Sequence, residues 1–365
     1  MRVVICANTA WNLWNFRRGL IRALLDAGVE VFAVAPADKY APALVGMGCR
    51  FEDMPMDSMG TSPLKDTHLL LRFQKLFRRV RPHFFLGYTI KPNIYGSIAA
   101  QLCGVATINN ISGLGNAFLR KNWLNRIVRT LYAWSLVRSD HVFFQNPDDR
   151  ALFLDLGLVK AGRSSLLPGS GVDLAHFLPA PPRGDEVRFL LIARLLWDKG
   201  VGEYVEAARI VRQRFPGTRF QLLGFLGPEN PSAIDRRTLE DWIAEGAVEY
   251  VGRRDDVRPV IADADCMVLP SYYPEGTPRT LLEGAAMGKP LIATDVPGCR
   301  EVVEHGVNGY LCQPRDPADL ANKIGEFLQL TEGNLAAMRA ASRRKAERQF
   351  DENIVIRAYL QKLGC

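Results

Sequence analysis

The sequence lacks the features that mark several large classes of protein. No stretch comes near the roughly 18 uninterrupted apolar residues that a membrane-spanning helix needs. The apolar residues at the N-terminus are too few for a signal peptide, so we expect the chain to stay in the cytoplasm. The seven cysteines are scattered without a CxxC pair, which is typical of buried thiols in a reducing compartment.

Motifs for the common cofactors are absent as well. No GxxxxGK[ST] occurs, which argues against a P-loop NTPase, and no GxGxxG follows the first apolar run, which argues against a dinucleotide-dependent oxidoreductase. No HExxH motif or paired-cysteine arrangement points to a metal. We therefore expect neither a metal nor another resident cofactor.

The composition is that of a folded protein with two domains. Hydrophobic residues make up 48% and charged residues 23% of the chain, and 365 residues exceed what one core usually serves. Residues 1–170 contain 21 Lys and Arg against 11 Asp and Glu, whereas residues 171–365 contain 25 against 28. The first half is therefore expected to face an anionic partner, such as nucleic acid, a phosphate-bearing substrate or a membrane surface.

Short apolar runs alternate with helix-period stretches along the whole chain. This alternation predicts an α/β protein of two tandem doubly wound (Rossmann-like) domains, each with a parallel sheet between helices. The expected strands are 2–7, 29–35, 83–87, 105–109 and 141–145, then 187–192, 218–223, 247–251, 265–269, 290–294 and 309–312. The expected helices are 16–27, 65–81, 92–103, 121–138 and 147–156, then 200–215, 235–245, 279–288 and 316–330.

The expected domains are an N-terminal domain at 1–170, a Gly- and Pro-rich linker at 171–184 and a C-terminal domain at 185–348. Residues 349–365 are expected to form a C-terminal helix, with a return to the N-terminal domain as an open alternative. Doubly wound sheets bind ligands at the carboxyl ends of their strands. We therefore expect the site in a cleft which the two domains face.

Two glutamates flank the start of the helix expected at 279–288. Glu275 precedes the helix and Glu283 lies about one turn inside it, with the backbone N–H groups of Gly276 and Thr277 at its mouth and Pro278 at its start. The N–H groups suit an anion, and the carboxylates suit the hydroxyls of a sugar and a ribose. The alternative is that Glu275 caps the helix and Glu283 is merely solvated.

A pair of cations follows the first strand of the second half. Arg194 leaves the strand end and Lys199 precedes the next helix, so both are expected in the same cleft. Two fixed cations suit a diphosphate. The alternative is two surface charges in a turn.

Together these residues resemble a known family. Glu275 and Glu283 form an E-x7-E motif, and with Arg194, Lys199-Gly200, the segment 169–173 and the run 297–309 they resemble a retaining glycosyltransferase of family 4 with the GT-B fold. The segments IARLLWDKGVGEYVEAA, EGTPRTLLEGAAMGKP and GLGNAF resemble, more narrowly, bacterial N-acetylgalactosaminyltransferases that act on undecaprenyl-diphosphate-linked sugars.

The resemblance implies a role for each motif residue. Arg194 and Lys199 would neutralise the donor diphosphate, and Glu283 would accept hydrogen bonds from the ribose. The donor sugar and its phosphate would be held by Glu275 with Gly276, Thr277 and Pro278, and the nucleotide base would lie near Arg253. Arg194, Lys199 and Glu275 are thus the candidate catalytic residues.

The first half departs from the family pattern. It lacks the Gly-Gly doublet after the first strand and the His after the 105–109 strand, so no catalytic histidine can be named. Asn15, Arg17, Lys91, Asn110, Gly113 and Gly115 are the candidates for the vicinity of the acceptor or donor sugar. Arg17 and Lys91 could bind acceptor phosphate or simply be solvated.

The mechanism that the resemblance implies is a front-face substitution without a metal. Double displacement would need a carboxylate nucleophile and a second carboxylate, and the first half offers no such pair. The leaving diphosphate would instead help to deprotonate the acceptor, with the cations stabilising its charge. The likeness favours a UDP-sugar carrying HexNAc and a lipid-diphosphate-linked saccharide, in bacterial glycan or polysaccharide assembly, with a GDP-mannose-dependent mannosyltransferase as the alternative.

Two basic helices bear on the partner of the first half. The 65–81 helix carries Leu69, Phe73, Leu76, Phe77 and Val80 on one stripe among basic residues, and the 119–138 stretch adds Trp123, Tyr132 and Trp134. Such helices fit an anionic membrane surface and a peripheral location on the inner face of the cytoplasmic membrane, or else a stripe that faces the core. A nucleic-acid-binding protein and a non-catalytic sugar-nucleotide binder are the alternatives of another class. The first explains none of the motifs in the second half, so we expect no nucleic acid partner.

Overall fold

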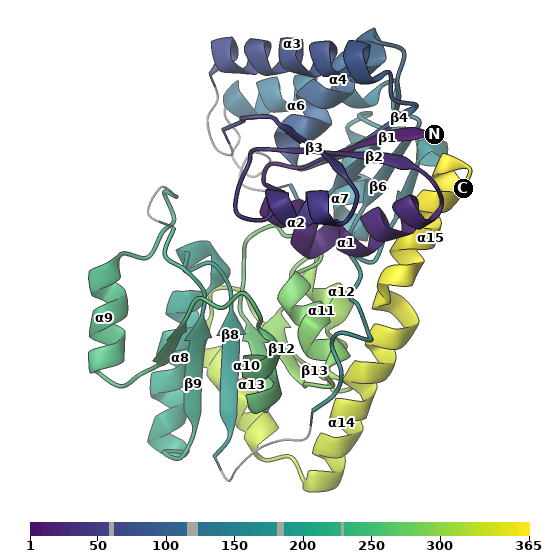
Figure 1. Cartoon of the computed structure of the whole chain (residues 1–365). Helices are drawn as coiled ribbons and strands as arrows, with labels where there is room; N and C mark the ends of the chain where they lie inside the picture. Colours follow the sequence, from purple (N-terminus) through teal and green to yellow (C-terminus); the bar gives the residue numbers. More distant parts are fainter. Residues whose placement is uncertain (58–61, 115–122, 181–185, 228–229) are drawn as a thin grey trace. The chain divides into compact units, whose positions relative to one another are not determined.

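The computed structural model describes residues 1–57, 62–114, 123–180, 186–227 and 230–365 (Figure 1). The chain divides into two compact units. Unit 1 comprises Met1–Ser170 and Glu352–Cys365, and unit 2 comprises Gly171–Asp351. The chain thus passes between the units twice, after Ser170 and after Asp351.

Unit 1 is built on a seven-stranded parallel sheet in the order β3-β2-β1-β4-β5-β6-β7. The strands are β1 (Arg2–Cys6), β2 (Glu30–Ala35), β3 (Arg50–Asp53), β4 (Phe84–Tyr88), β5 (Ala106–Ile111), β6 (His141–Phe144) and β7 (Ser164–Leu166). The helices are α1 (Ala10–Asp26), α2 (Ala41–Gly46), α3 (Pro63–Val80), α4 (Ser97–Leu102), α6 (Trp123–Leu136), α7 (Pro147–Asp155) and α15 (Glu352–Leu363), and a π-helical turn at Pro92–Gly96 precedes α4.

The alternating side chains of the strands explain why helices cover both faces of this sheet. Val3 and Ile5 of β1 pack with α1 and α15, whereas Val4 and Cys6 pack with α3 and α4. Figure 1 shows α3, α4 and α6 stacked on one side of the sheet and α1 on the other. A strand buried on both faces reads as an unbroken apolar run, as β1 does.

Unit 2 repeats the plan with a six-stranded parallel sheet in the order β10-β9-β8-β11-β12-β13. The strands are β8 (Arg188–Ile192), β9 (Arg219–Leu223), β10 (Glu249–Gly252), β11 (Cys266–Leu269), β12 (Leu291–Thr294) and β13 (Gly309–Cys312). The helices are α8 (Val201–Arg214), α9 (Arg236–Ala244), α10 (Arg258–Asp263), α11 (Arg279–Ala286), α12 (Cys299–Val302), α13 (Pro317–Leu328) and α14 (Glu332–Lys345). Unit 2 also has a 3-10 turn at Trp197–Lys199 and a π-helical turn at Ala346–Phe350, and unit 1 has a 3-10 turn at Ala161–Arg163.

The prediction of two doubly wound α/β domains is confirmed, and the strands of unit 2 lie where the sequence placed them. The sequence missed two strands of unit 1, β3 and β7, and the helices α2, α10, α12 and α14. Both strands are short and lie at the edges of the sheet, where β3 has exposed ends. Such segments need no apolar run, so their periodicity is weak.

The first part of the segment expected as a linker is packed into unit 2. Residues 171–180 belong to unit 2, because the Val172 side chain and the Phe177 ring are buried in its core and the Val172 N–H donates to the Phe350 carbonyl at 2.7 Å. Residues 181–185 lie outside the described part of the chain. The C-terminal helix α15 belongs to unit 1, where Val355, Tyr359 and Leu363 pack against α1.

The apolar stripe of α3 faces the core. Its five predicted members, Leu69, Phe73, Leu76, Phe77 and Val80, are all buried, and Phe73 and Phe77 pack on Phe85 of the sheet. The core-facing alternative for the stripe therefore holds. Among the described residues no helix is both long and apolar enough to cross a membrane.

Candidate active site

The strand order of unit 2 reverses between β8 and β11, and open α/β sheets bind ligands just beyond such a reversal. Two loops leave the sheet at this point. The first, after β8, carries Arg194 and Lys199, and the second, after β11, carries Glu275. The sheet topology therefore brings the three candidate catalytic residues to one edge of the sheet of unit 2, and this edge is called the crevice of unit 2 below.

Lys199 and Glu275 form a nearly buried ion pair. The Lys199 Nζ lies 2.5 Å from the Glu275 Oε1, and the two side chains are only 11% and 15% exposed. The same oxygen accepts a hydrogen bond at 3.0 Å from the hydroxyl of Ser271, which is itself fully buried. The ammonium also lies 4.9 Å from the centroid of the Tyr273 ring. The carboxylate and the ammonium are thus fixed by several contacts each, which rules out the reading of Lys199 as a mere surface charge.

Arg194 is exposed and lies beside Tyr273. Burial raises the pKa of the Tyr273 hydroxyl above its ordinary value, and the neighbouring Arg194 opposes that shift through its charge and a hydrogen bond. The tyrosine therefore stands between the two cations, with its ring on Lys199 and its hydroxyl near Arg194. This arrangement leaves one exposed positive charge next to one that is paired.

Backbone contacts lock the two loops together. The N–H groups of Tyr272 and Tyr273 donate to the Asp198 carbonyl at 3.1 and 3.0 Å. Gly200 has a φ of 73°, and a Cβ there would lie 2.0 Å from the Pro270 carbonyl oxygen, so the close approach requires glycine. Gly298, after β12, similarly abuts the Gly276 carbonyl. Gly200, which follows Lys199, and Gly298, which follows Pro297, thus allow the loops after β8, β11 and β12 to pack closely together.

Glu283 is held by a partner from its own helix. The Arg279 Nε lies 2.9 Å from the Glu283 Oε1, with side chains 15% and 12% exposed, and the guanidinium also donates to the Gly171 carbonyl. Burial raises the pKa of Glu283 above its ordinary value, and Arg279 opposes the shift. Glu283 is therefore not the solvated surface residue of the alternative interpretation.

The remaining donor candidates lie in two places. Gly276 and Thr277 are buried directly before α11, whose N-cap is Pro278. Arg253 is exposed after β10, and its guanidinium carbon lies 5.4 Å from the centroid of the Phe225 ring, which follows β9. An exposed ring and a cation thus stand at the ends of neighbouring strands, a suitable surface for a planar base. The donor and catalytic roles of all these residues stay predictions.

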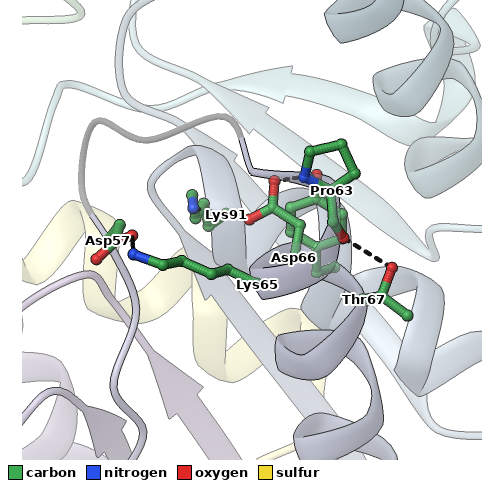
Figure 2. Close-up of polar contacts among 7 residues, drawn as sticks. Asp57, Pro63, Lys65, Asp66, Thr67 and Lys91 are labelled. Carbon is green, nitrogen blue, oxygen red and sulfur yellow. Dashed lines mark hydrogen bonds and ion pairs between the residues drawn. The ribbon is translucent and has the colours of Figure 1, made fainter.

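The candidates of unit 1 fall into different environments. Arg17 on α1 is buried, and its guanidinium carbon lies 4.1 Å from the centroid of the Tyr88 ring at the end of β4. Lys91, three residues beyond β4, forms an ion pair with Asp66 at 2.7 Å, as Figure 2 shows. The Tyr95 hydroxyl donates to the same carboxylate at 2.9 Å, so Lys91 fixes the first turn of α3.

The amide side chains of unit 1 are engaged within the protein. The Asn15 Nδ2 donates to the Trp11 carbonyl of its own helix at 2.9 Å. Asn110 is fully buried, where its Nδ2 donates to the Tyr359 hydroxyl at 3.2 Å and its Oδ1 accepts from Gln145 at 3.0 Å. Gly113 follows β5 with a φ of 108°, and Gly115 lies outside the described residues. Any part of Asn110 in the reaction would therefore be indirect.

Sequence reasoning missed several residues that complete these sites. Ser271 and Tyr273 share the loop of Glu275, and polar residues directly after an apolar strand were a signal that could have found them. Arg279 precedes Glu283 by four residues, a spacing at which opposite charges pair on a helix. Tyr359 comes from the far end of the chain, and nothing local in the sequence indicates its contact with Asn110.

Within the described ranges, no group of three or more His, Cys, Asp or Glu side chains is placed to hold an ion. The charged groups of the site are side chains of the protein itself.

Comparison with known proteins identifies the family. Residues 13–169 match the model of the glycosyl transferase 4-like domain, and residues 186–330 match that of glycosyl transferases group 1. The two models together cover most of the chain, one for each unit. The protein therefore belongs to the group 1 glycosyltransferases and is a hexosyltransferase.

Relatives and solved structures agree with this assignment. The chain is 27% identical, over 99% of its length and 98% of the relative, to N,N'-diacetylbacillosaminyl-diphospho-undecaprenol alpha-1,3-N-acetylgalactosaminyltransferase of Campylobacter jejuni subsp. jejuni. It is 24% identical, over 72% of its length and 70% of the relative, to UDP-Gal:alpha-D-GlcNAc-diphosphoundecaprenol alpha-1,3-galactosyltransferase of Escherichia coli. The structure of Anabaena Alr3699/HepE, solved with UDP and glucose, matches 100% of this chain and 99% of that one at 18% identity with a TM-score of 0.79. The fold is GT-B.

Proposed function

We propose that this protein transfers a HexNAc residue, with retention, from a UDP-sugar to a lipid-diphosphate-linked saccharide in bacterial glycan or polysaccharide assembly. The observation that carries the proposal is the crevice of unit 2, where Lys199, Glu275 and Arg194 gather around Tyr273. The choice of substrates is supported by the full-length relative from Campylobacter jejuni and the relative from Escherichia coli, whose names both specify undecaprenol-diphosphate-linked sugars.

In this proposal the crevice works by electrostatics. Arg194 and Lys199 neutralise the diphosphate of the donor, and their attraction grows as negative charge builds on the leaving group. Glu275 holds Lys199 in place through the 2.5 Å contact and accepts hydrogen bonds from hydroxyls of the donor sugar. Glu283, oriented by Arg279, accepts those of the ribose, and the base lies on Phe225 and Arg253. The leaving diphosphate takes the proton of the acceptor hydroxyl on the same face, which retains the configuration, and no metal is required.

The test is a panel of UDP- and GDP-sugars with a short prenyl-diphosphate-linked saccharide as acceptor. We expect thermal stabilisation and nucleotide release with a UDP-HexNAc. Transfer from GDP-mannose alone would replace the proposed donor by that of a mannosyltransferase, and binding without transfer from every donor would favour a non-catalytic sugar-nucleotide binder.

We further propose that unit 1 contacts an anionic membrane surface through exposed apolar and basic side chains of its helices. Leu102 at the end of α4, Trp134 on α6 and Val137 directly after α6 are 62–66% exposed. The Gln101 Nε2 donates to the Ser135 carbonyl at 2.6 Å, which links the two helices. Exposed Trp beside basic residues such as Arg138 suits the interface of a bilayer. This surface, rather than the buried stripe of α3, supports a peripheral location.

Vesicle sedimentation tests the membrane proposal. Trp134→Ser with Val137→Ser should weaken binding to vesicles that contain acidic lipid, and Lys75→Glu with Arg78→Glu on the exposed face of α3 should weaken it further, by about 1 kcal/mol per basic residue near the surface. Arg236→Glu on unit 2 is the control. Equal binding by all variants would refute the membrane contact, and salt-dependent retention on nucleic acid in its place would favour the nucleic-acid alternative.

A further inference from the structure

Arg17 is a buried cation in unit 1 without a balancing group among the described residues. The residue is 5% exposed, and neither its Nε nor its Nη1 has a hydrogen-bond acceptor in the part of the chain that the structure describes. The guanidinium carbon lies over the ring of Tyr88, 4.1 Å from its centroid. A ring contact leaves the N–H groups in the guanidinium plane without acceptors, and burying such donors is costly.

The position of Arg17 is that of a ligand site. The strand order of unit 1 reverses between β1 and β4, and Tyr88 is the last residue of β4. Helix α1 follows β1 directly, with Thr9 as its N-cap, so the positive end of its dipole lies at the same edge of the sheet. Because side chains lean toward the N-terminus of their helix, Arg17 on the second turn extends toward this reversal. Unit 1 therefore has a strand reversal of its own, and the edge of the sheet at this reversal, where such sheets bind ligands, is called the crevice of unit 1 below.

The other cation at this edge is already neutralised. Lys91 is paired with Asp66 in the first turn of α3 (Figure 2). The Asp66 carboxylate also accepts a hydrogen bond from the Tyr95 hydroxyl, so the charge of Lys91 stabilises the start of α3. Arg17 and Lys91 are the two cations that the sequence predicts could bind the acceptor phosphate, and of these two only Arg17 has no ion-pair partner in the described part of the chain. An uncompensated buried cation lowers the stability of the free protein.

We propose that Arg17 binds the phosphate or diphosphate group of the acceptor in the crevice of unit 1. The planar guanidinium matches phosphate geometry, and the low exposure of the site strengthens the attraction. Tyr359 on the C-terminal helix α15 accepts a hydrogen bond from Asn110, and the centroid of its ring lies 6.0 Å from that of Tyr88. The two tyrosines thus pack together beside Arg17. The assignment to the acceptor rests on the proposed function, whereas the binding of phosphate does not.

The test is calorimetric titration of inorganic pyrophosphate into the full-length protein, in an Arg194→Ala/Lys199→Ala background that removes the cations of unit 2. Arg17→Met should weaken binding about 30-fold or more, the loss expected when one partner of a buried charge pair is truncated. Arg22→Met, an exposed arginine on the same helix, should leave it unchanged. The melting temperature of Arg17→Met should equal or exceed that of the background, because a buried unpaired charge is removed.

A conservative variant and two further ligands test the role of Arg17 independently. Arg17→Lys, which keeps the charge but loses the planar fork, should bind pyrophosphate with intermediate affinity, and it replaces Arg17→Met if that variant does not fold. A short prenyl diphosphate should show the same dependence on Arg17, whereas binding of inorganic phosphate alone would overturn the assignment to the acceptor. Pyrophosphate affinity that is equal in the Arg17 and Arg22 variants, or a lower melting temperature in Arg17→Met with unchanged affinity, would make Arg17 purely structural. A protein that binds pyrophosphate through Arg17 but transfers no sugar would contradict the proposed function and leave this inference standing.

Discussion

Replacing Lys199 by Met should lower both stability and transfer, and the structure separates the two effects. Removing one partner of a fully buried ion pair costs about 3–5 kcal/mol. Here about a tenth of each side chain stays exposed and Ser271 still donates to Glu275, so we expect a loss of about 2–3 kcal/mol in the free energy of unfolding. Transfer should fall about 10²- to 10³-fold, as when a single group that stabilises the transition state is lost.

The double variant Lys199→Met/Glu275→Gln distinguishes these effects. It removes the uncompensated carboxylate, so stability should return to within about 1 kcal/mol of the parent, while transfer stays low. The control Arg236→Met breaks a pair with Glu240 that spans 3.8 Å and is 78% and 63% exposed, and should cost less than about 0.5 kcal/mol. Urea unfolding and nucleotide release measure the two quantities. If Lys199→Met unfolds like the control, or if the double variant recovers transfer, the reasoning is wrong.

Three further variants test other parts of the structure. Gly200→Ala should destabilise unit 2 by about 1–3 kcal/mol and impair transfer, because a Cβ at positive φ meets the Pro270 carbonyl, which urea unfolding would register. Burial lowers the pKa of His141 to about 4, so the unfolded chain binds the proton first and unit 1 should lose up to about 3 kcal/mol as pH falls from 6.5 toward 4, a slope that His141→Gln removes. Glu283 accepts hydrogen bonds from the ribose more strongly when it is ionised, so the donor KM should rise as pH falls toward its raised pKa, and Glu283→Gln should give a high KM with little pH dependence.

Each of these variants has a matched control in the chain. Gly217→Ala introduces a Cβ into open space and should be nearly neutral. His68→Gln alters an exposed histidine and is the control for His141→Gln, and Glu326→Gln alters an exposed carboxylate on α13 and is the control for Glu283→Gln. If a control variant changes stability, its pH dependence or the donor KM as much as the corresponding test variant does, that expectation is contradicted.

The sequence predicted what depends on local pattern. The strands of unit 2 are continuous apolar runs, and Arg194, Lys199 and Glu275 follow strands that the topology brings to one edge. The pairing of Lys199 with Glu275 was not predictable, because 76 residues separate the two and their contact depends on how Gly200 packs on Pro270.

The same limit explains the differences in unit 1. Lys91 and Arg17 both follow the expected pattern of cations beyond strand ends or on the first helix. Only the fold reveals that Asp66, 25 residues away, neutralises one of them and that the ring of Tyr88 buries the other. Spacing indicates which residues share an edge of a sheet, whereas long-range partners decide which charges stay available.

The central claim is tested most directly by transfer from UDP-HexNAc to a short prenyl-diphosphate-linked saccharide, with chelator-treated protein and the anomeric configuration of the product read by NMR. The account predicts a product with the configuration of the donor, one UDP released for each sugar transferred, and a drop of about 10²-fold or more in Arg194→Ala. Inverted product, activity that returns only with Mg²⁺ or Mn²⁺, or near wild-type turnover in Arg194→Ala would contradict it.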